Sequence, residues 1–245
     1  MNGELKNLIE ENFNLLRKVL DESYTLKSVS DVRTAFIYRH TRNIYRLGQD
    51  VVFLLEANRL DSCPIIVRAM LESLFKLVAA VKISETAVQI FINEIEAELA
   101  WAKKELDLNG NDSAATIERF SGKAEELRRE YNVTSKKKWN TLACAEAAGL
   151  GQMYSGEYFV FSKHAHAMTS GIMLREHKTG AGHVLQTIFT IVTYTTSSFV
   201  QSIKTISPEG HIKEVVRLAK QTLKLNAEDV FCKMDRPKDS SHPSG

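Results

Sequence analysis

The chain has 245 residues, of which 44% are hydrophobic and 25% charged, and its formal net charge at pH 7 is +2. These values are ordinary for a globular protein, and so small a charge does not by itself indicate binding to nucleic acid or to an anionic membrane. Three cysteines without a CxxC pair argue against a disulfide framework, and no segment approaches the ~20 uninterrupted apolar residues of a membrane span. We therefore expect a soluble cytoplasmic protein that does not contact a membrane.

Hydrophobic residues recur at helical spacing through almost the whole chain, which predicts an all-α protein. The expected helices cover about 5–24, 30–57, 65–81, 84–108, 113–131, 140–148, 154–168, 184–204 and 212–225. The helix over 65–81 is apolar nearly all round, so we place it at the buried centre. For 184–204, which is rich in threonine and β-branched residues, a pair of strands is the alternative. The prediction is a single-domain bundle of about eight to nine helices over 1–232, followed by a polar tail over 233–245.

One expected helix carries four polar side chains at strict four-residue intervals beside very apolar neighbours. They are Tyr154, Tyr158, Ser162 and His166. Residues four apart in a helix project from nearly the same face, so these side chains form one winding stripe about 18 Å long. Buried hydroxyls and imidazoles need hydrogen-bond partners, since an unpaired one costs ~1–3 kcal/mol. The stripe therefore predicts a second polar surface facing it.

The apolar helix over 65–81 supplies the expected partners, Arg68 and Glu72, which are also four residues apart. We expect the two helices to meet across a polar pocket in which Arg68 pairs with Glu72, and Glu72 or Ser162 orients His166. Two interpretations of this pocket remain open. It is either a catalytic or ligand-binding site, or a buried ion pair that only sets the register of the helices.

These motifs, with Trp139 between them, resemble an uncharacterised family of bacterial helical proteins. The resemblance covers about residues 35–205 and implies no established activity. The chain is also distantly similar to HEPN domains, helical bundles that act as dimeric, metal-independent ribonucleases in toxin and phage-defence systems. This resemblance implies RNA or a nucleotide as the ligand, and a homodimer. The HEPN motif R-x4-6-H has its nearest match in Arg33-x6-His40, a match expected about once by chance.

His166 with Arg68 is the better substitute for that motif, because arginine binds phosphate and histidine transfers protons. Such a pair would support attack of a ribose 2′-hydroxyl on its own phosphate without a metal, with Glu72, Ser162 and Tyr158 as further catalytic candidates. The alternatives are a non-catalytic sensor of a nucleotide or anion, with Tyr154 among its contacts, and a structural homodimerisation module.

Two basic segments are further candidates for ligand binding. Arg39, Arg42 and Arg46 share one helix face, which either meets phosphates or an acidic partner, or is simply solvated. Lys137 and Trp139 lie in a basic run with an adjacent aromatic residue, a pattern that fits single-stranded RNA.

No metal or cofactor is expected. His164 and His166 are two residues apart, so on a helix they point about 200° apart and cannot share a metal ion. No P-loop or GxGxxG pattern is present.

Overall fold

The computed structural model describes residues 3–24, 31–109, 114–134, 137–165 and 180–202. Within these ranges the chain forms helices and no strands, which confirms the all-α prediction. The predicted helix over 212–225 and the polar tail over 233–245 lie outside the described residues, and the domain boundaries stay a prediction.

Most of the expected helices are present with boundaries within a few residues of the prediction. In chain order the described elements are α1 (Gly3–Tyr24), α2 (Val32–Glu56), the short η1 (Leu60–Ser62), α3 (Cys63–Lys82), α4 (Ser84–Asn109), α5 (Ala114–Phe120), α6 (Lys123–Glu130), α7 (Thr141–Ala148), α8 (Gly151–Met153), the π-helical turn η3 (Tyr154–Tyr158), α9 (Phe159–Ala165) and α11 (Gly180–Ser202).

The helix expected over 184–204 is present as α11, and the alternative of a strand pair is not realised, because its threonine hydroxyls donate to backbone carbonyls one turn earlier and do not compete with the helix. One expectation about these elements was wrong. The single helix expected over 113–131 is divided into α5 and α6. Gly122 lies between them with φ +78°, a left-handed conformation that interrupts the helix and that glycine adopts without strain.

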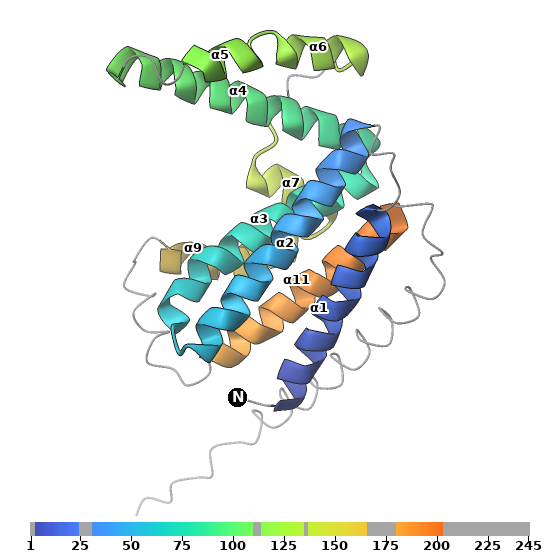
Figure 1. The fold of residues 1–245 in the computed structure, drawn as a ribbon, viewed down its shortest axis with the longest axis vertical. Coiled ribbons are helices and arrows are strands. Elements are labelled where there is room, and N and C mark those ends of the chain that lie inside the picture. Colours follow the sequence, from blue (N-terminus) through green and yellow to red (C-terminus); the bar gives the residue numbers. More distant parts are fainter. Residues whose placement is uncertain (1–2, 25–30, 110–113, 135–136, 166–179, 203–245) are drawn as a thin grey trace, which may run out of the picture.

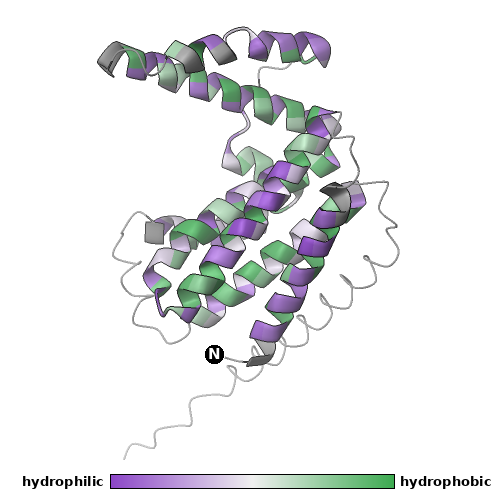
Figure 2. Cartoon of the chain, in the orientation of Figure 1, coloured by the Kyte–Doolittle hydropathy of each residue, from purple (hydrophilic) through white to green (hydrophobic). Residues whose placement is uncertain are grey.

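The helix α3 lies at the centre of the bundle, as its apolar composition predicted. Eleven of its twenty residues are buried, and it packs against α2, α7, α9 and α11. Figure 1 shows α1, α11, α2 and α3 running alongside one another, with α4 across one end of this bundle and α5 and α6 beyond α4. In Figure 2 the bundle helices carry hydrophobic stretches, whereas α6 is mostly hydrophilic. The candidate sites described below lie around α3, and one of them also includes a residue of α4.

Two local features fix the positions of α1, α2 and α3. A side chain at Gly48 of α2 would overlap the ring of Phe13, so the glycine permits α1 to pack closely on α2. Arg33, at the start of α2, donates hydrogen bonds of 3.1 and 2.9 Å to the carbonyl oxygens of Ala80 and Val81. These are among the last carbonyls of α3, which have no partner within the helix. Arg33 thereby ties the first turn of α2 to the last turn of α3.

No helix among the described residues combines the length and the apolar character needed to cross a membrane.

Candidate functional site

The two polar motifs singled out in the sequence meet between α3 and the π-helical turn η3. Arg68 Nε lies 3.1 Å from Glu72 Oε1, and the Tyr158 hydroxyl donates to the same oxygen at 2.8 Å. The guanidinium of Arg68 also lies 5.6 Å from the centre of the Tyr158 ring. Tyr154 stacks on Tyr158 with ring centres 4.9 Å apart. We call Arg68, Glu72, Tyr154 and Tyr158 the polar seam.

The neighbours of Arg68 in the polar seam favour its charged form. Its guanidinium donates a hydrogen bond to the Tyr158 oxygen, which raises the pKa of Arg68, and the Glu72 carboxylate adds to this effect, so the guanidinium stays protonated. The side chains of Arg68 and Glu72 are 28% and 35% exposed, and water therefore screens their attraction. Two contacts, from Arg68 and from Tyr158, hold the Glu72 carboxylate in position.

Ser162 and His166 would continue the stripe beyond Tyr158. The Ser162 hydroxyl oxygen is buried and has no hydrogen-bond partner among the described residues. His166 lies outside the described residues, so its expected approach to Arg68 remains a prediction.

A second feature, which we call the basic groove, lies between α2, α3 and α4 and has a volume of about 610 Å³. Its lining residues are Tyr38, Arg39, His40, Arg42, Asn43 and Arg46 from α2, Ala69, Glu72, Ser73 and Lys76 from α3, and Glu94 from α4. Glu72 thus belongs to both features: its carboxylate accepts from Tyr158 on one side of α3 and lines the groove on the other.

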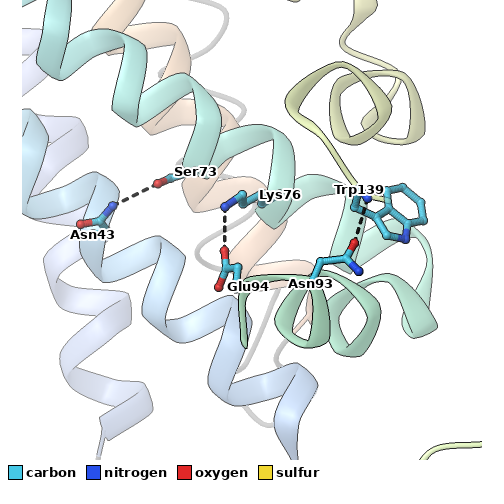
Figure 3. Close-up of polar contacts among 6 residues, drawn as sticks. All are labelled: Asn43, Ser73, Lys76, Asn93, Glu94 and Trp139. Atoms are coloured by element: carbon cyan, nitrogen blue, oxygen red, sulfur yellow. Dashed lines mark hydrogen bonds and ion pairs between the residues drawn. The ribbon is translucent and has the colours of Figure 1, made fainter. Parts of the chain in front are cut away.

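The walls of the basic groove are joined by polar contacts between its three helices (Figure 3). Asn43 of α2 donates to the Ser73 hydroxyl of α3 at 3.0 Å, and Lys76 of α3 contacts Glu94 of α4 at 2.6 Å. Because Glu72 and Glu94 already face the cations Arg68 and Lys76, the groove's carboxylates are engaged. The groove also holds three arginines: Arg39, Arg42 and Arg46. None of the three has an ion-pair or hydrogen-bond partner within the described part of the chain.

His40 lies against this groove with its imidazole buried. The residue is 8% exposed, and neither ring nitrogen has a hydrogen-bond partner among the described residues. Its ring packs on Phe36 with centres 4.3 Å apart. Burial, with a smaller effect from the charges of Lys76 and Arg39, lowers the pKa of His40 to about 3. The imidazole is therefore neutral at pH 7 and retains one donor and one acceptor nitrogen.

A model of a family of unknown function, DUF5677, matches residues 34–182. The chain belongs to this family. No curated protein and no solved structure matches it. The DUF5677 match runs from the start of α2 to the start of α11, so it includes both the polar seam and the basic groove. This membership confirms the expected relation to an uncharacterised family, and the HEPN-like relation stays a prediction.

The remaining residues predicted for ligand binding within the DUF5677 region lie apart from the groove lining. Trp139 is held against α4, where its backbone N–H donates to Asn93 at 2.9 Å (Figure 3). Its indole N–H donates to Gln89 of the same helix at 2.6 Å. The ammonium of Lys137 lies 4.1 Å from the centre of the Trp139 ring. The indole thus connects the segment before α7 to α4, and the structure does not bring these two residues together with Arg39 and Arg42.

Four other titratable groups are paired or buried. His183 lies 2.9 Å from Glu157, and this contact lowers the pKa of the Glu157 carboxyl. Burial raises the thiol pKa values of Cys63 and Cys144 to about 11, so both stay protonated at neutral pH. Among the described residues no three His, Cys, Asp or Glu side chains come together as metal ligands would.

Sequence reasoning identified Arg39, Arg42, Arg46 and Glu72 but missed Ser73 and Lys76 of α3, which also line the groove. Lys76 lies three residues after Ser73 and four after Glu72 on an otherwise apolar helix, and this spacing was the available signal for a polar face of α3. The burial of His40 had no such signal, because it depends on how closely α2 packs on its neighbours.

Proposed function

We propose that this DUF5677 protein binds a phosphate-bearing ligand in the basic groove. The observation that carries the proposal is the buried His40 imidazole: among the residues that the structure describes, neither it nor the three arginines beside it has a hydrogen-bond or ion-pair partner. A buried polar group without a partner costs ~1–3 kcal/mol, so such groups are rare unless a ligand or function uses them. A phosphate oxygen would accept the imidazole N–H.

The charges of the groove favour an anion over a neutral ligand. Arginine guanidinium groups bind phosphate oxygens in bidentate fashion, and three of them lie on one helix face. The nearby cations Lys76 and Arg39 disfavour the protonated form of His40 in the unliganded protein. A bound anion would offset this positive field.

Arg42→Gln tests the proposal, with binding of AMP, inorganic phosphate and short oligonucleotides measured by calorimetry and by thermal denaturation. A ligand that binds only the folded protein raises stability by RT ln(1 + [L]/Kd), or ~2.7 kcal/mol at 100 times Kd. We expect a phosphate-bearing ligand to stabilise the wild type and Arg42→Gln to weaken its binding about tenfold, as for a lost charge-assisted hydrogen bond. The matched control is Arg129→Gln, which removes an exposed arginine of α6. Equal binding by wild type and Arg42→Gln would contradict the proposal.

Cleavage of RNA is a second candidate, which the HEPN-like resemblance favours. What supports it is a neutral imidazole, at His40, beside arginines suited to hold a phosphodiester. The imidazole would take the proton of the ribose 2′-hydroxyl as that oxygen attacks phosphorus, and the 5′-oxygen would leave. The pair expected from the sequence, His166 with Arg68, is the alternative catalytic set.

Separate alanine variants of His40, His166 and Arg68 distinguish these sets. Cleavage of a labelled RNA, but not of the matching DNA, is expected from the wild type if the protein is a ribonuclease. Loss of cleavage in His40→Ala alone would assign the groove, and loss in His166→Ala and Arg68→Ala would assign the seam. No cleavage by the wild type, together with retained phosphate binding, favours the sensor function. The homodimer implied by the HEPN-like resemblance, and proposed with it, is tested by sedimentation equilibrium.

A further inference from the structure

A second depression lies between α2 and α1, with a volume of about 420 Å³. It is lined by Arg17, Leu20, Asp21, Tyr38, Arg42 and Tyr45. Two of these residues, Tyr38 and Arg42, also line the basic groove. The two depressions therefore meet over α2, and a ligand in one can extend across Arg42 into the other.

The arginines of α2 are spread along the helix and not gathered at one point. Arg39, Arg42 and Arg46 are three and four residues apart, which corresponds to about 4.5 and 6 Å along the helix axis. From first to last they span roughly 10 Å. A row of this length can contact several phosphates of one chain, whereas a single phosphate meets only part of it.

The second depression offers aromatic rings where the groove offers cations. Tyr38 and Tyr45 are two helical turns apart on α2 and are both half-buried. Tyr45 is held by an edge contact with Phe13 at 5.9 Å and by a hydrogen bond from Gln49 to its hydroxyl at 2.9 Å. The ring of Tyr38 lies 6.3 Å from that of Phe199, centre to centre. Rings held by such contacts lose little conformational freedom when a flat group stacks on them.

Asp21 makes the second depression less suitable for phosphate than the groove. Its carboxylate lines the depression beside the cations Arg17 and Arg42. A phosphate there would meet a like charge, whereas a nucleobase is uncharged and can accept or donate hydrogen bonds. The groove along Arg39 and Arg46 is therefore suited to phosphates, and the second depression, with its two tyrosines, is suited to bases.

We propose that the ligand is a single-stranded nucleic acid whose backbone follows Arg39, Arg42 and Arg46 while its bases stack on Tyr38 and Tyr45. This inference rests on the proposed phosphate binding and names its ligand class. Positive charge along a backbone path together with adjacent aromatic rings is typical of single-strand binding. A duplex keeps its bases within the helix and cannot place them on the tyrosines. A mononucleotide is too short to use the whole row of arginines.

Fluorescence anisotropy with the full chain tests the inference, using a labelled 12-nucleotide pyrimidine strand, an abasic strand of equal length and the corresponding duplex. We expect the pyrimidine strand to bind at least tenfold more tightly than the duplex or competing AMP. Tyr38→Leu and Tyr45→Leu should each weaken its binding at least about fivefold, the lower end of the range for one stacked base, and leave binding of the abasic strand unchanged. Arg46→Gln should reduce the slope of log K against log salt by about 0.7, the value for one phosphate contact in a single strand.

Three controls separate lost stacking from lost folding. Tyr38→Phe and Tyr45→Phe keep the rings and should bind as the wild type does. Tyr194→Leu removes an exposed tyrosine of α11 that lines neither depression and should also leave binding unchanged. Urea denaturation of each leucine variant verifies that it is folded under the binding conditions.

The outcomes distinguish this inference from the proposed function. If AMP or phosphate binds through Arg42 but the leucine variants bind the strand as tightly as the wild type, the inference is overturned and phosphate binding stands. Equal affinity for the duplex overturns it as well. Binding of polyglutamate as tight as that of the strand would overturn it in favour of an acidic protein partner. If no phosphate-bearing ligand binds, both proposals fail.

Discussion

Replacing His40 by leucine should remove a specific pH dependence from the stability of the protein. The imidazole is buried and its pKa is lowered from 6.5 to about 3, so the folded protein keeps it neutral while the unfolded chain protonates it near pH 6.5. The unfolded state therefore binds this proton more tightly than the folded state does, and the stability of the folded state falls as the pH falls. This contribution is fully present above pH 6.5 and is lost progressively as the pH falls toward about 3.

The size of the effect follows from these two pKa values. At pH 5 the ratio of protonated to neutral imidazole is about thirty in the unfolded chain, whereas the imidazole of the folded protein is still neutral. The factor of about thirty corresponds to ~2 kcal/mol of stability lost between pH 7.5 and pH 5. His40→Leu removes the titrating group and keeps a side chain of similar size. It also removes a buried polar group that has no hydrogen-bond partner in the described ranges of the chain, so at pH 7.5 we expect the variant to be at least as stable as the wild type.

Urea denaturation followed by circular dichroism at 222 nm, in phosphate-free buffers from pH 7.5 to pH 5, measures both proteins. The other histidines titrate in both, so the difference between the two pH profiles isolates His40. We expect the wild type to lose ~2 kcal/mol more than His40→Leu over this interval. Equal losses, or a variant that is clearly less stable at pH 7.5, would refute the reasoning and indicate that the imidazole has a partner in the folded protein.

Three further substitutions test the packing around α3 in the same denaturation assay. Tyr158→Phe removes the 2.8 Å hydrogen bond to Glu72 and should lower the free energy of unfolding by ~1 kcal/mol, since the carboxylate is partly exposed; no change would mean that water replaces the hydroxyl. Gly48→Ala places a methyl group into the ring of Phe13 and should cost ~1–3 kcal/mol, and a neutral effect would show that α1 can move away freely. Arg33→Met keeps most of the aliphatic stem but leaves the last carbonyls of α3 without their donors, and should cost ~1–2 kcal/mol; an unaffected variant would contradict the capping role.

The contacts between α3 and the tyrosines of η3 show which part of a site a sequence pattern can predict. Residues four apart lie on one helix face whatever the surroundings, so Arg68 with Glu72 and Tyr154 with Tyr158 were each expected to act together. Charged side chains on an apolar helix require partners, and the tyrosine stripe was the available complement. The structure confirms the contacts of Arg68 and Glu72 with Tyr158. The approach of His166 lies outside the described residues.

The sequence by itself determined the helical class, the central position of α3 and the sharing of one face by Arg39, Arg42 and Arg46, because these follow from the local period of the backbone. Only the tertiary structure decided that these arginines form a groove with residues of α3 and α4, and that His40 is buried beside them. A cavity and the desolvation of a side chain depend on the distances and angles between helices. These distances and angles are set by the simultaneous packing of many side chains that are distant in sequence, and no local spacing encodes them.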